Sequence, residues 1–409
     1  MRKLVLSVAC ILTLLASSVL AQDPDVIVGS IPNISNYTAN GGVDALSIGT
    51  TSCNIGTSNL DWIANTNDHP VIAQHAYRLL NGRFEMIGQS WLKHGFTALT
   101  GNLCDTCSGI GGSVLGVGCS DPYGSGLNGS QGGLGPKFEV NASTGVFSYP
   151  FSNPNGSTGN SVFKRLQIPL SELGAPGAQY FVEAHYVTKD DAAAGNQNNN
   201  ASYRAMTISG GPSNYSFGLT GSTVQEQPAI FAWEAADPSV TITTVDVPSD
   251  GRFHVAYKST DNGNGTHDVE FAVHNLNSHR SGQAFTVDVP AGATITNIGF
   301  HDVSYHSGEP FANTDWSSSA SGNQVNWSTE TFNTNSDANA LRWGTTYNFR
   351  FTTDMQLDAN GSVLTTIDLF RSGSPTSVAA SFDPNTRWPS SRVTTRALAL
   401  ATCLPTLWS

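Results

Sequence analysis

The sequence predicts an all-β protein with two β-sandwich or jelly-roll-like domains. Charged residues make up only 12% of the 409 residues and glycine occupies 41 positions, whereas an average soluble domain is about 25% charged. Short apolar stretches alternate with polar residues and are separated by Gly, Asn and Pro, which is typical of strands joined by turns. A chain of this length has room for two domains.

Residues 1–21 have the pattern of a signal peptide. Arg2 and Lys3 precede an apolar stretch, and a small-residue cleavage site ends at Ala21. No later segment reaches the ~20 apolar residues that a membrane span requires. We therefore expect a secreted protein, extracellular or periplasmic, without membrane insertion. The net charge of −12 excludes nucleic acid as a partner, because phosphates would be repelled.

Residues 24–237 are predicted to form the first domain. Strands are expected at 166–169, 180–187, 204–209 and 230–233. Residues 70–80 have apolar side chains at helical spacing, but residues 84–91 alternate like a strand. A helix and a β-hairpin turning at Asn81 are both compatible with this segment.

A long Gly-rich loop at 101–135 contains three cysteines, and the mature chain has two more. In an oxidising compartment, the first expectation for clustered cysteines is that they form disulfides. We expect two bridges within the first domain, which leave one cysteine unpaired. A thiolate metal site at the Cys104–Cys107 spacing is the alternative. The cysteines are Cys53, Cys104, Cys107, Cys119 and Cys403.

Residues 238–385 are predicted to form the second domain, a β-sandwich. Residues 251–258 and 268–275 alternate around the Gly- and Asn-rich turn 261–265, which predicts a hairpin. Further strands are expected at 284–290, 294–303, 324–328, 347–353 and 364–370. Residues 386–409 are a tail of unclear structure.

Histidines in the second domain suggest a metal site. His279, His301 and His306 follow or end predicted strands, so their loops could meet at one rim of the sandwich, with Asp302 or Glu309 nearby. Imidazole and carboxylate ligands suit copper or zinc. The alternative is that these histidines are solvated. His254 and His267, in the hairpin, are expected to face solvent.

Two histidines of the first domain are further candidates. His69 could bind a metal, and His94, close to the cysteine-containing loop, could be a ligand or a general base. Tyr305 is a second candidate base. His185 is expected in the core or on a strand face, and Trp316, in a polar loop, is expected to be exposed and able to stack on a sugar ring.

Familiar catalytic motifs are absent from the sequence: it has no GxSxG elbow, HExxH motif or phosphate-binding loop. The favoured function is a secreted copper-type oxidoreductase acting on an extracellular polymer or a small organic substrate. One alternative is a metal-free or zinc polysaccharide hydrolase or lyase, with His94 or Tyr305 as the base. The other is a non-catalytic glycan-binding or cell-surface protein.

Over residues 25–378, four stretches are similar to sequences found in one known family: Trp91–Phe96, Leu115–Tyr123, Ala192–Asn200 and Gly299–Asp302. Because of these stretches, the chain resembles a family of secreted β-rich proteins of environmental bacteria. The C-terminal half looks like an immunoglobulin or fibronectin-like module. The resemblance implies an extracellular location and transfers no established activity.

Overall fold

The computed structural model describes residues 23–383 except 213 and 359–360. Over these residues the chain is built almost entirely of β-strands, which confirms the predicted all-β class. The signal peptide, Cys403 and the tail 386–409 lie outside the described residues. Among the described residues, no helix has the length and apolar character needed to cross a membrane.

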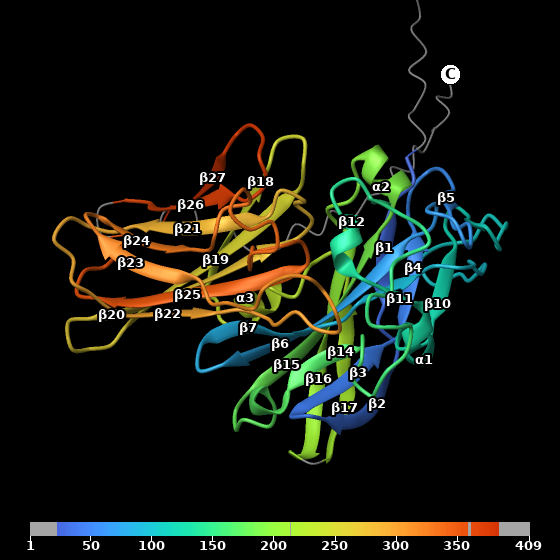
Figure 1. The fold of residues 1–409 in the computed structure, drawn as a ribbon, viewed down its shortest axis with the longest axis horizontal. Helices are drawn as coiled ribbons and strands as arrows, with labels where there is room; N and C mark the ends of the chain where they lie inside the picture. The colour runs from blue at the N-terminus through green and yellow to red at the C-terminus, as the bar shows by residue number, and fades with distance from the viewer. Residues whose placement is uncertain (1–22, 213, 359–360, 384–409) are drawn as a thin grey trace, which may run out of the picture.

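The first half of the chain is dominated by one ten-stranded antiparallel sheet (Figure 1). Its main path runs β17-β16-β15-β6-β7-β14-β3-β2, and β8 and β11 pair beside it. The strands are β2 (Ile34–Asn40), β3 (Val43–Ile48), β6 (Val71–Leu80), β7 (Arg83–Gln89), β8 (Leu92–His94), β11 (Leu134–Gly135), β14 (Leu166–Pro169), β15 (Gln179–Val187), β16 (Ala201–Gly211) and β17 (Asn214–Val224).

A three-stranded sheet, β1-β4-β10, covers part of the large sheet. Val26 and Val28 of this small sheet share a core with Ile72 and Ala184 of the large one, so the two form a sandwich. The smaller elements are β1 (Val26–Ser30), β4 (Thr50–Asn54), β5 (Leu60–Asp61), β9 (Val114–Leu115), β10 (Ser120–Tyr123), β12 (Val140–Asn141), β13 (Val146–Phe147), α1 (Ser125–Asn128), α2 (Lys189–Ala194), η1 (Gln131–Gly133), η2 (Lys137–Glu139) and η3 (Leu170–Glu172).

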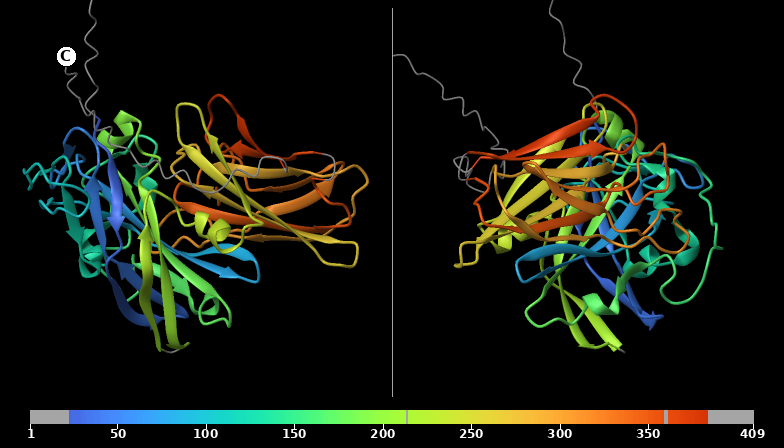
Figure 2. Two further views of the ribbon diagram at one scale, coloured as in Figure 1. Left: turned by 180° about the vertical axis from the view of Figure 1, so that it is seen from behind. Right: turned by 60° about the vertical axis from the view of Figure 1, so that its left-hand side comes forward.

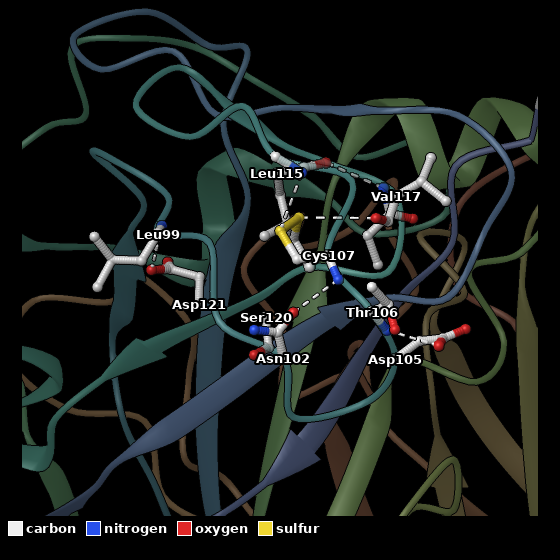
Figure 3. The surroundings of a disulfide bond; sticks show 12 residues. Leu99, Asn102, Asp105, Thr106, Cys107, Leu115, Val117, Ser120 and Asp121 are labelled. Carbon is white, nitrogen blue, oxygen red and sulfur yellow. Dashed lines mark hydrogen bonds between the residues drawn. A yellow bond between two sulfur atoms is a disulfide. The ribbon is translucent and has the colours of Figure 1, made fainter.

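Two disulfides hold the Gly-rich loop, and they confirm the predicted bridges. Cys53 pairs with Cys104, and Cys107 pairs with Cys119. Figure 3 shows the loop around Cys107, whose backbone N–H donates to the side chain of Asn102 at 2.8 Å. The sulfur atoms are therefore bonded to one another, and the alternative of a thiolate metal site is wrong.

Residues 70–89 form a hairpin, so the helical alternative is wrong. β6 and β7 pair around Asn81 and Gly82, whose φ angles of 52° and 78° are those of a tight hairpin turn. The apolar spacing that resembled a helix has another origin. β6 is covered on both faces and pairs along its length with β15, so nearly every position is buried.

The second half is a sandwich of two five-stranded antiparallel sheets. The predicted hairpin is confirmed as β19 and β20. Trp316, expected to be exposed, is only 4% exposed and packs in the aromatic core. One sheet contains β18 (Thr241–Asp246), β19 (Arg252–Asp261), β20 (His267–Asn275), β25 (Thr345–Thr353) and β22 (Ile295–His301); the other contains β23 (Ser317–Ser321), β24 (Gln324–Ser328), β21 (Gly282–Asp288), β26 (Val363–Leu369) and β27 (Ser377–Phe382).

One buried cluster extends from the second half into the first, beside the separate core of the first sandwich. The β6–β7 hairpin extends along the second sandwich, with α3 (Phe231–Ala236) beside it (Figure 2). Phe84 and Met86 of the hairpin belong to the same buried cluster as Phe253, and Asn348 donates to the backbone oxygen of Phe84 at 2.9 Å. The division at residue 238 stays a prediction, although the strands change sheets between β17 and β18.

Candidate functional site

The three histidines predicted to form one metal shell lie apart. Among the described residues, the single group of three His, Cys, Asp or Glu residues with ligand atoms within 4.8 Å of one another contains His301 but neither of the others. Both ring nitrogens of His306 are hydrogen-bonded inside the protein, to the Ser307 hydroxyl at 2.9 Å and the Gln89 backbone oxygen at 2.8 Å. The strand ends that carry these histidines do not converge.

The group that contains His301 is organised around an arginine. Its other members, Glu85 and Glu172, bind the guanidinium of Arg78 at 2.6 and 2.7 Å. Arg78 already supplies the positive charge that these carboxylates require, and a metal ion would have to displace it. The geometry is therefore that of a structural ion-pair network.

His69 and His94 are brought together in the first half. His69 Nε2 lies 2.9 Å from His94 Nδ1. His94 Nε2 is buried and has no hydrogen-bond partner, while Phe151 stacks on the ring and a Cβ built at Gly135 would lie 2.5 Å from it. Burial, with smaller contributions from His69 and Lys93, lowers the pKa of His94 to about 3. This closed, weakly basic imidazole is a poor general base.

Two of the other predicted residues meet at a narrow hollow between the two halves, about 20 Å³ in volume, which we call the basic cleft. Residues of η2 and β12 line it from the first half, and residues of the second half complete it. His279 and Tyr305, both predicted from the sequence, line it. The lining residues are Lys137, Phe138, Val140, His279, Ser281, Tyr305, Phe311, Arg342, Trp343 and Arg371.

Two contacts across the halves fix the shape of the basic cleft. The Trp343 indole donates to the backbone oxygen of Val140 at 3.1 Å. Glu309, predicted as a metal ligand, accepts hydrogen bonds from the backbone N–H groups of Lys137 at 2.5 Å and Phe138 at 3.3 Å. The Glu309 carboxylate therefore holds η2 in place, a positioning role that sequence spacing could not show.

Positive charge dominates the basic cleft. Lys137, Arg342 and Arg371 form no salt bridge within 4.0 Å to any residue that the structure describes. The Nε atoms of both arginines are buried without a hydrogen-bond partner. Burial lowers the pKa of each arginine, because desolvation penalises the charged form. Lys137 Nζ donates to Gln89 Oε1 at 3.1 Å and to a backbone oxygen at 3.3 Å, and Arg342 Nη2 donates to two backbone oxygens. The unpartnered Nε–H groups of the two arginines are therefore the donors left for an anion.

Aromatic side chains also line the basic cleft. The Arg342 guanidinium lies 3.4 Å from the centroid of the Phe311 ring, and Lys137 Nζ lies 5.0 Å from that of Trp343. Arg371 also borders a neighbouring hollow, where its guanidinium lies 5.1 Å from the Phe332 ring centroid. Charge and flat apolar surface therefore occur together over both hollows.

His279 and Tyr305 have different protonation chemistry in the basic cleft. The His279 ring makes no hydrogen bond to the described residues, and burial followed by Arg371 lowers its pKa, so the ring is neutral at pH 7. Burial raises the pKa of Tyr305 to about 12, and its hydroxyl donates to the Ala340 backbone oxygen at 3.3 Å. Tyr305 remains a phenol, so the geometry favours His279 over Tyr305 as a base.

A buried histidine cluster between the halves was missed by sequence reasoning. His75, Glu183 and His185 on β6 and β15 face His254 and His274 on β19 and β20, and all five are at most 4% exposed. The expectation that His254 is solvated is wrong, whereas His185 is buried as expected. Glu183 accepts from His75 Nδ1 at 2.7 Å and the Ala229 N–H at 2.6 Å. The alternation of side chains along these strands was the sequence signal that could have indicated which histidines face the core.

The comparisons with known proteins identify no family. No family model and no curated protein matches the chain, so the resemblance stated above remains a prediction beyond its β-rich character. Similar solved structures include a chain from a structure of manganese lipoxygenase of Gaeumannomyces graminis with part of zonadhesin of Komagataella pastoris. That chain is 9% identical, with 87% of this chain and 93% of that one covered and a TM-score of 0.22.

Two further matches are bacterial surface proteins. The collagen adhesin of S. aureus is 8% identical, with 89% of this chain and 94% of that one covered and a TM-score of 0.17. The collagen-binding domain of the Erysipelothrix rhusiopathiae surface protein RspB is 7% identical, with 87% and 96% covered and a TM-score of 0.19. With TM-scores this low, neither the fold nor the function of these proteins can be inferred for this chain.

Proposed function

We propose that this protein binds an acidic extracellular glycan, a polymer carrying carboxylate or sulfate groups, in the basic cleft. The observation that carries the proposal is the pair Arg342 and Arg371, which have no carboxylate in salt-bridge reach among the described residues and which each have a buried, unpartnered Nε. Guanidinium groups bind carboxylates and sulfates through paired hydrogen bonds, and such charge-assisted bonds are the strong ones.

The surroundings of these cations support a sugar as the carrier of the anion. Phe332 is partly exposed in the adjoining hollow, while Phe311 and Trp343 line the basic cleft itself. Sugar rings stack on such faces while their substituents bind to polar groups. The adjoining hollow, which shares Arg371 and has a volume of about 380 Å³, could hold a sugar unit, with its acid group reaching toward the arginines of the basic cleft. The predicted secretion would place the protein where such polymers occur.

A lyase is the second candidate function, and His279 favours it. A neutral imidazole beside Arg342 and Arg371 could remove the proton α to a uronate carboxylate while the arginines stabilise the developing negative charge. The electron pair left by the proton would form a C=C bond as the β C–O glycosidic bond breaks, and the departing oxygen would take a proton from water, leaving an unsaturated sugar. The copper or zinc oxidoreductase is not carried forward, because His279, His301 and His306 do not share one site.

The binding test compares charged and uncharged forms of one polymer. Calorimetry should show binding of polygalacturonate, and little binding of its fully methyl-esterified form. Replacing Arg342 and Arg371 with Gln should weaken binding at least about tenfold, because a hydrogen bond to a charged group contributes about 1.5–3 kcal/mol. Arg83→Gln, in an ion pair with Glu270, is the matched control. Equal binding of both polymers, or full binding by the double variant, would refute the proposal.

Ultraviolet absorbance of the unsaturated product separates the two candidate functions. A lyase should form this product, and His279→Ala should abolish it while binding persists. Binding without product identifies a glycan-binding protein. A sulfated dextran paired with plain dextran tests the same cleft for sulfate in place of carboxylate.

A further inference from the structure

The buried histidine cluster lies where the two halves of the chain pack against each other. His75, on β6, and His185, on β15, belong to the first half, whereas His254 and His274, on β19 and β20, belong to the second. Each of the four is at most 4% exposed. Figure 2 shows the β6–β7 hairpin extending along the strands of the second sandwich. Four imidazoles are therefore enclosed at one contact between the halves.

Two contacts show how closely the second half covers the imidazoles of the first. A Cβ built at Gly344, in the loop before β25, would lie 3.1 Å from His75 Nε2, so the backbone passes directly over this ring. The Trp343 indole packs edge-on against the His185 ring, with 5.9 Å between the ring centroids. Solvent can therefore surround these rings only when the halves part.

The hydrogen bonds of the cluster suit neutral imidazoles. Each ring has one buried nitrogen without a partner among the described residues: Nε2 of His75, His254 and His274, and Nδ1 of His185. A neutral imidazole can leave its acceptor nitrogen unused, whereas an imidazolium has two N–H donors that both need acceptors. Protonation would therefore bury a positive charge together with an unsatisfied donor, and both are costly in a protein interior.

The charged groups around the cluster do not balance four protons. Glu183, on β15, bonds to His75 Nδ1 at 2.7 Å and can balance one of them. Lys137, on η2, and Arg252, on β19, add positive charge, which disfavours protonation of the nearby imidazoles beyond the larger effect of burial on their pKa. Glu309 offsets part of the charge of Lys137.

The other elements packed on the cluster contribute uncharged groups. Thr244 of β18 and Thr346 of β25 contribute hydroxyls, and Phe231 of α3 contributes a ring. Tyr77 of β6 contributes a phenol, whose pKa is raised by burial. None of these four groups supplies negative charge in mild acid, so proton uptake would make the contact between the halves strongly positive.

The pH range of this effect follows from the shifts of the imidazoles. Burial lowers the pKa of His185, His254 and His274 to about 3, whereas an exposed imidazole has a pKa of about 6.5. The closed protein therefore binds fewer protons than an opened one. The contact keeps its full stability above about pH 6.5 and loses it as the pH falls toward about 3. Each imidazole that gains a proton on opening raises the opening constant about tenfold per pH unit.

We infer that the buried histidine cluster makes the contact between the two halves acid-sensitive, so that the halves are held together at neutral pH and released in mildly acidic surroundings. Histidine is the side chain whose charge ordinarily changes in this range, and the packed contact between the halves is the element that it biases. The inference is independent of the glycan proposal, because none of the four imidazoles lines the basic cleft and its test uses no glycan.

The test follows two N–H groups that are bonded across the halves to acceptors that do not titrate. The Thr346 backbone N–H donates to Met86 Sδ at 3.3 Å, and the Trp343 indole donates to the Val140 backbone oxygen at 3.1 Å. Hydrogen exchange of both groups in the full mature chain, corrected for the intrinsic rate at each pH, measures the opening constant. Between about pH 6.5 and about pH 5, this constant should rise at least about tenfold, while the amides of β21 keep their protection.

A double variant assigns the effect to the imidazoles. His254→Gln combined with His274→Gln removes two of the four titrating groups and keeps polar side chains beside the two threonine hydroxyls. Its opening constant should rise at least about tenfold less than that of the unmodified chain over the same pH range. His267→Gln, at the partly exposed start of β20, is the matched control and should behave like the unmodified chain.

Two outcomes would overturn the inference. One is equal protection of the Thr346 and Trp343 N–H groups at both pH values in the unmodified chain. The other is a loss of protection in the double variant as large as that in the unmodified chain. If circular dichroism at pH 7 shows that the double variant does not fold, His185→Phe, which keeps a ring against Trp343, replaces it under the same criterion.

Discussion

The basic cleft and the buried histidine cluster can be compared directly, because charge lacks an opposite partner in the first and is paired in the second. In the basic cleft, Arg342 and Arg371 have no carboxylate within salt-bridge reach among the described residues. The basic cleft is therefore incomplete in the sense that an anion would satisfy these arginines.

The buried histidine cluster shows the other arrangement. Glu183 is fully buried, and its oxygens accept hydrogen bonds from His75, Tyr77 and the Ala229 N–H. Arg78 similarly satisfies two glutamates. A buried charge that is paired internally contributes to the structure, whereas one left unpaired indicates a ligand.

The largest expected effect is the loss of an internal partner. Glu183→Ala should lower the free energy of unfolding by about 3–5 kcal/mol, because it leaves His75 and the Ala229 N–H buried without their acceptor. Chemical denaturation measures this change. Glu330→Ala, at an exposed position, should change stability by less than about 0.5 kcal/mol. A small effect at Glu183 would remove the distinction between paired and unpaired carboxylates.

A change in pH is expected to have an intermediate effect on anion affinity at the basic cleft. Burial lowers the pKa of Lys137 to about 8 and raises that of Glu309 to about 7. As the pH rises from about 6 to about 9, Glu309 gains negative charge and Lys137 loses positive charge. Both changes disfavour an anion, so polygalacturonate affinity should fall by about tenfold or more. Calorimetry across this range, with Lys137→Met to flatten the profile, checks the sign; a rising affinity would contradict it.

The smallest effect is expected at Asp191, a buried residue of α2 that forms no salt bridge to the described residues. Asp191→Asn should leave the free energy of unfolding within about 1 kcal/mol of the original. The substitution removes a charge without a salt-bridge partner, and its new Nδ2 can donate to the Asn200 Oδ1 atom, which has no hydrogen-bond donor among the described residues, after that amide turns. Chemical denaturation provides the measurement. A loss as large as that expected for Glu183→Ala would mean that the Asp191 charge is already compensated.

The sequence predicted the fold better than the site. The β19–β20 hairpin follows from alternation around a Gly-rich turn, and the bridges follow from four clustered cysteines in an exported chain. For residues 70–80, the sequence left a helix and a strand open. Pairing with β15, about 100 residues away, decides between them, and no local pattern contains that information.

For the candidate sites too, the sequence identified some of the residues but not which residues lie next to one another. His279 and Tyr305 were selected from the sequence and do line one cleft, but their neighbour Lys137 comes from the other half of the chain. Glu309 was selected as a ligand and instead anchors backbone N–H groups. His301 and His306 were placed with His279 on the assumption that strand ends meet at one rim, and the loops carry them to different surroundings.

The sequence by itself determined the β class, the turn positions and the disulfide-forming residues, because period-two alternation, glycine turns and cysteine chemistry act over short distances along the chain. Only the tertiary structure decided which charges are paired. Arg78 meets Glu172 and His75 meets Glu183 through strands distant in sequence, whereas Arg342 and Arg371 have no carboxylate within salt-bridge distance in the part of the chain that the structure describes. Pairing depends on long-range packing, and the proposed glycan site is a place where that packing leaves charge without a partner.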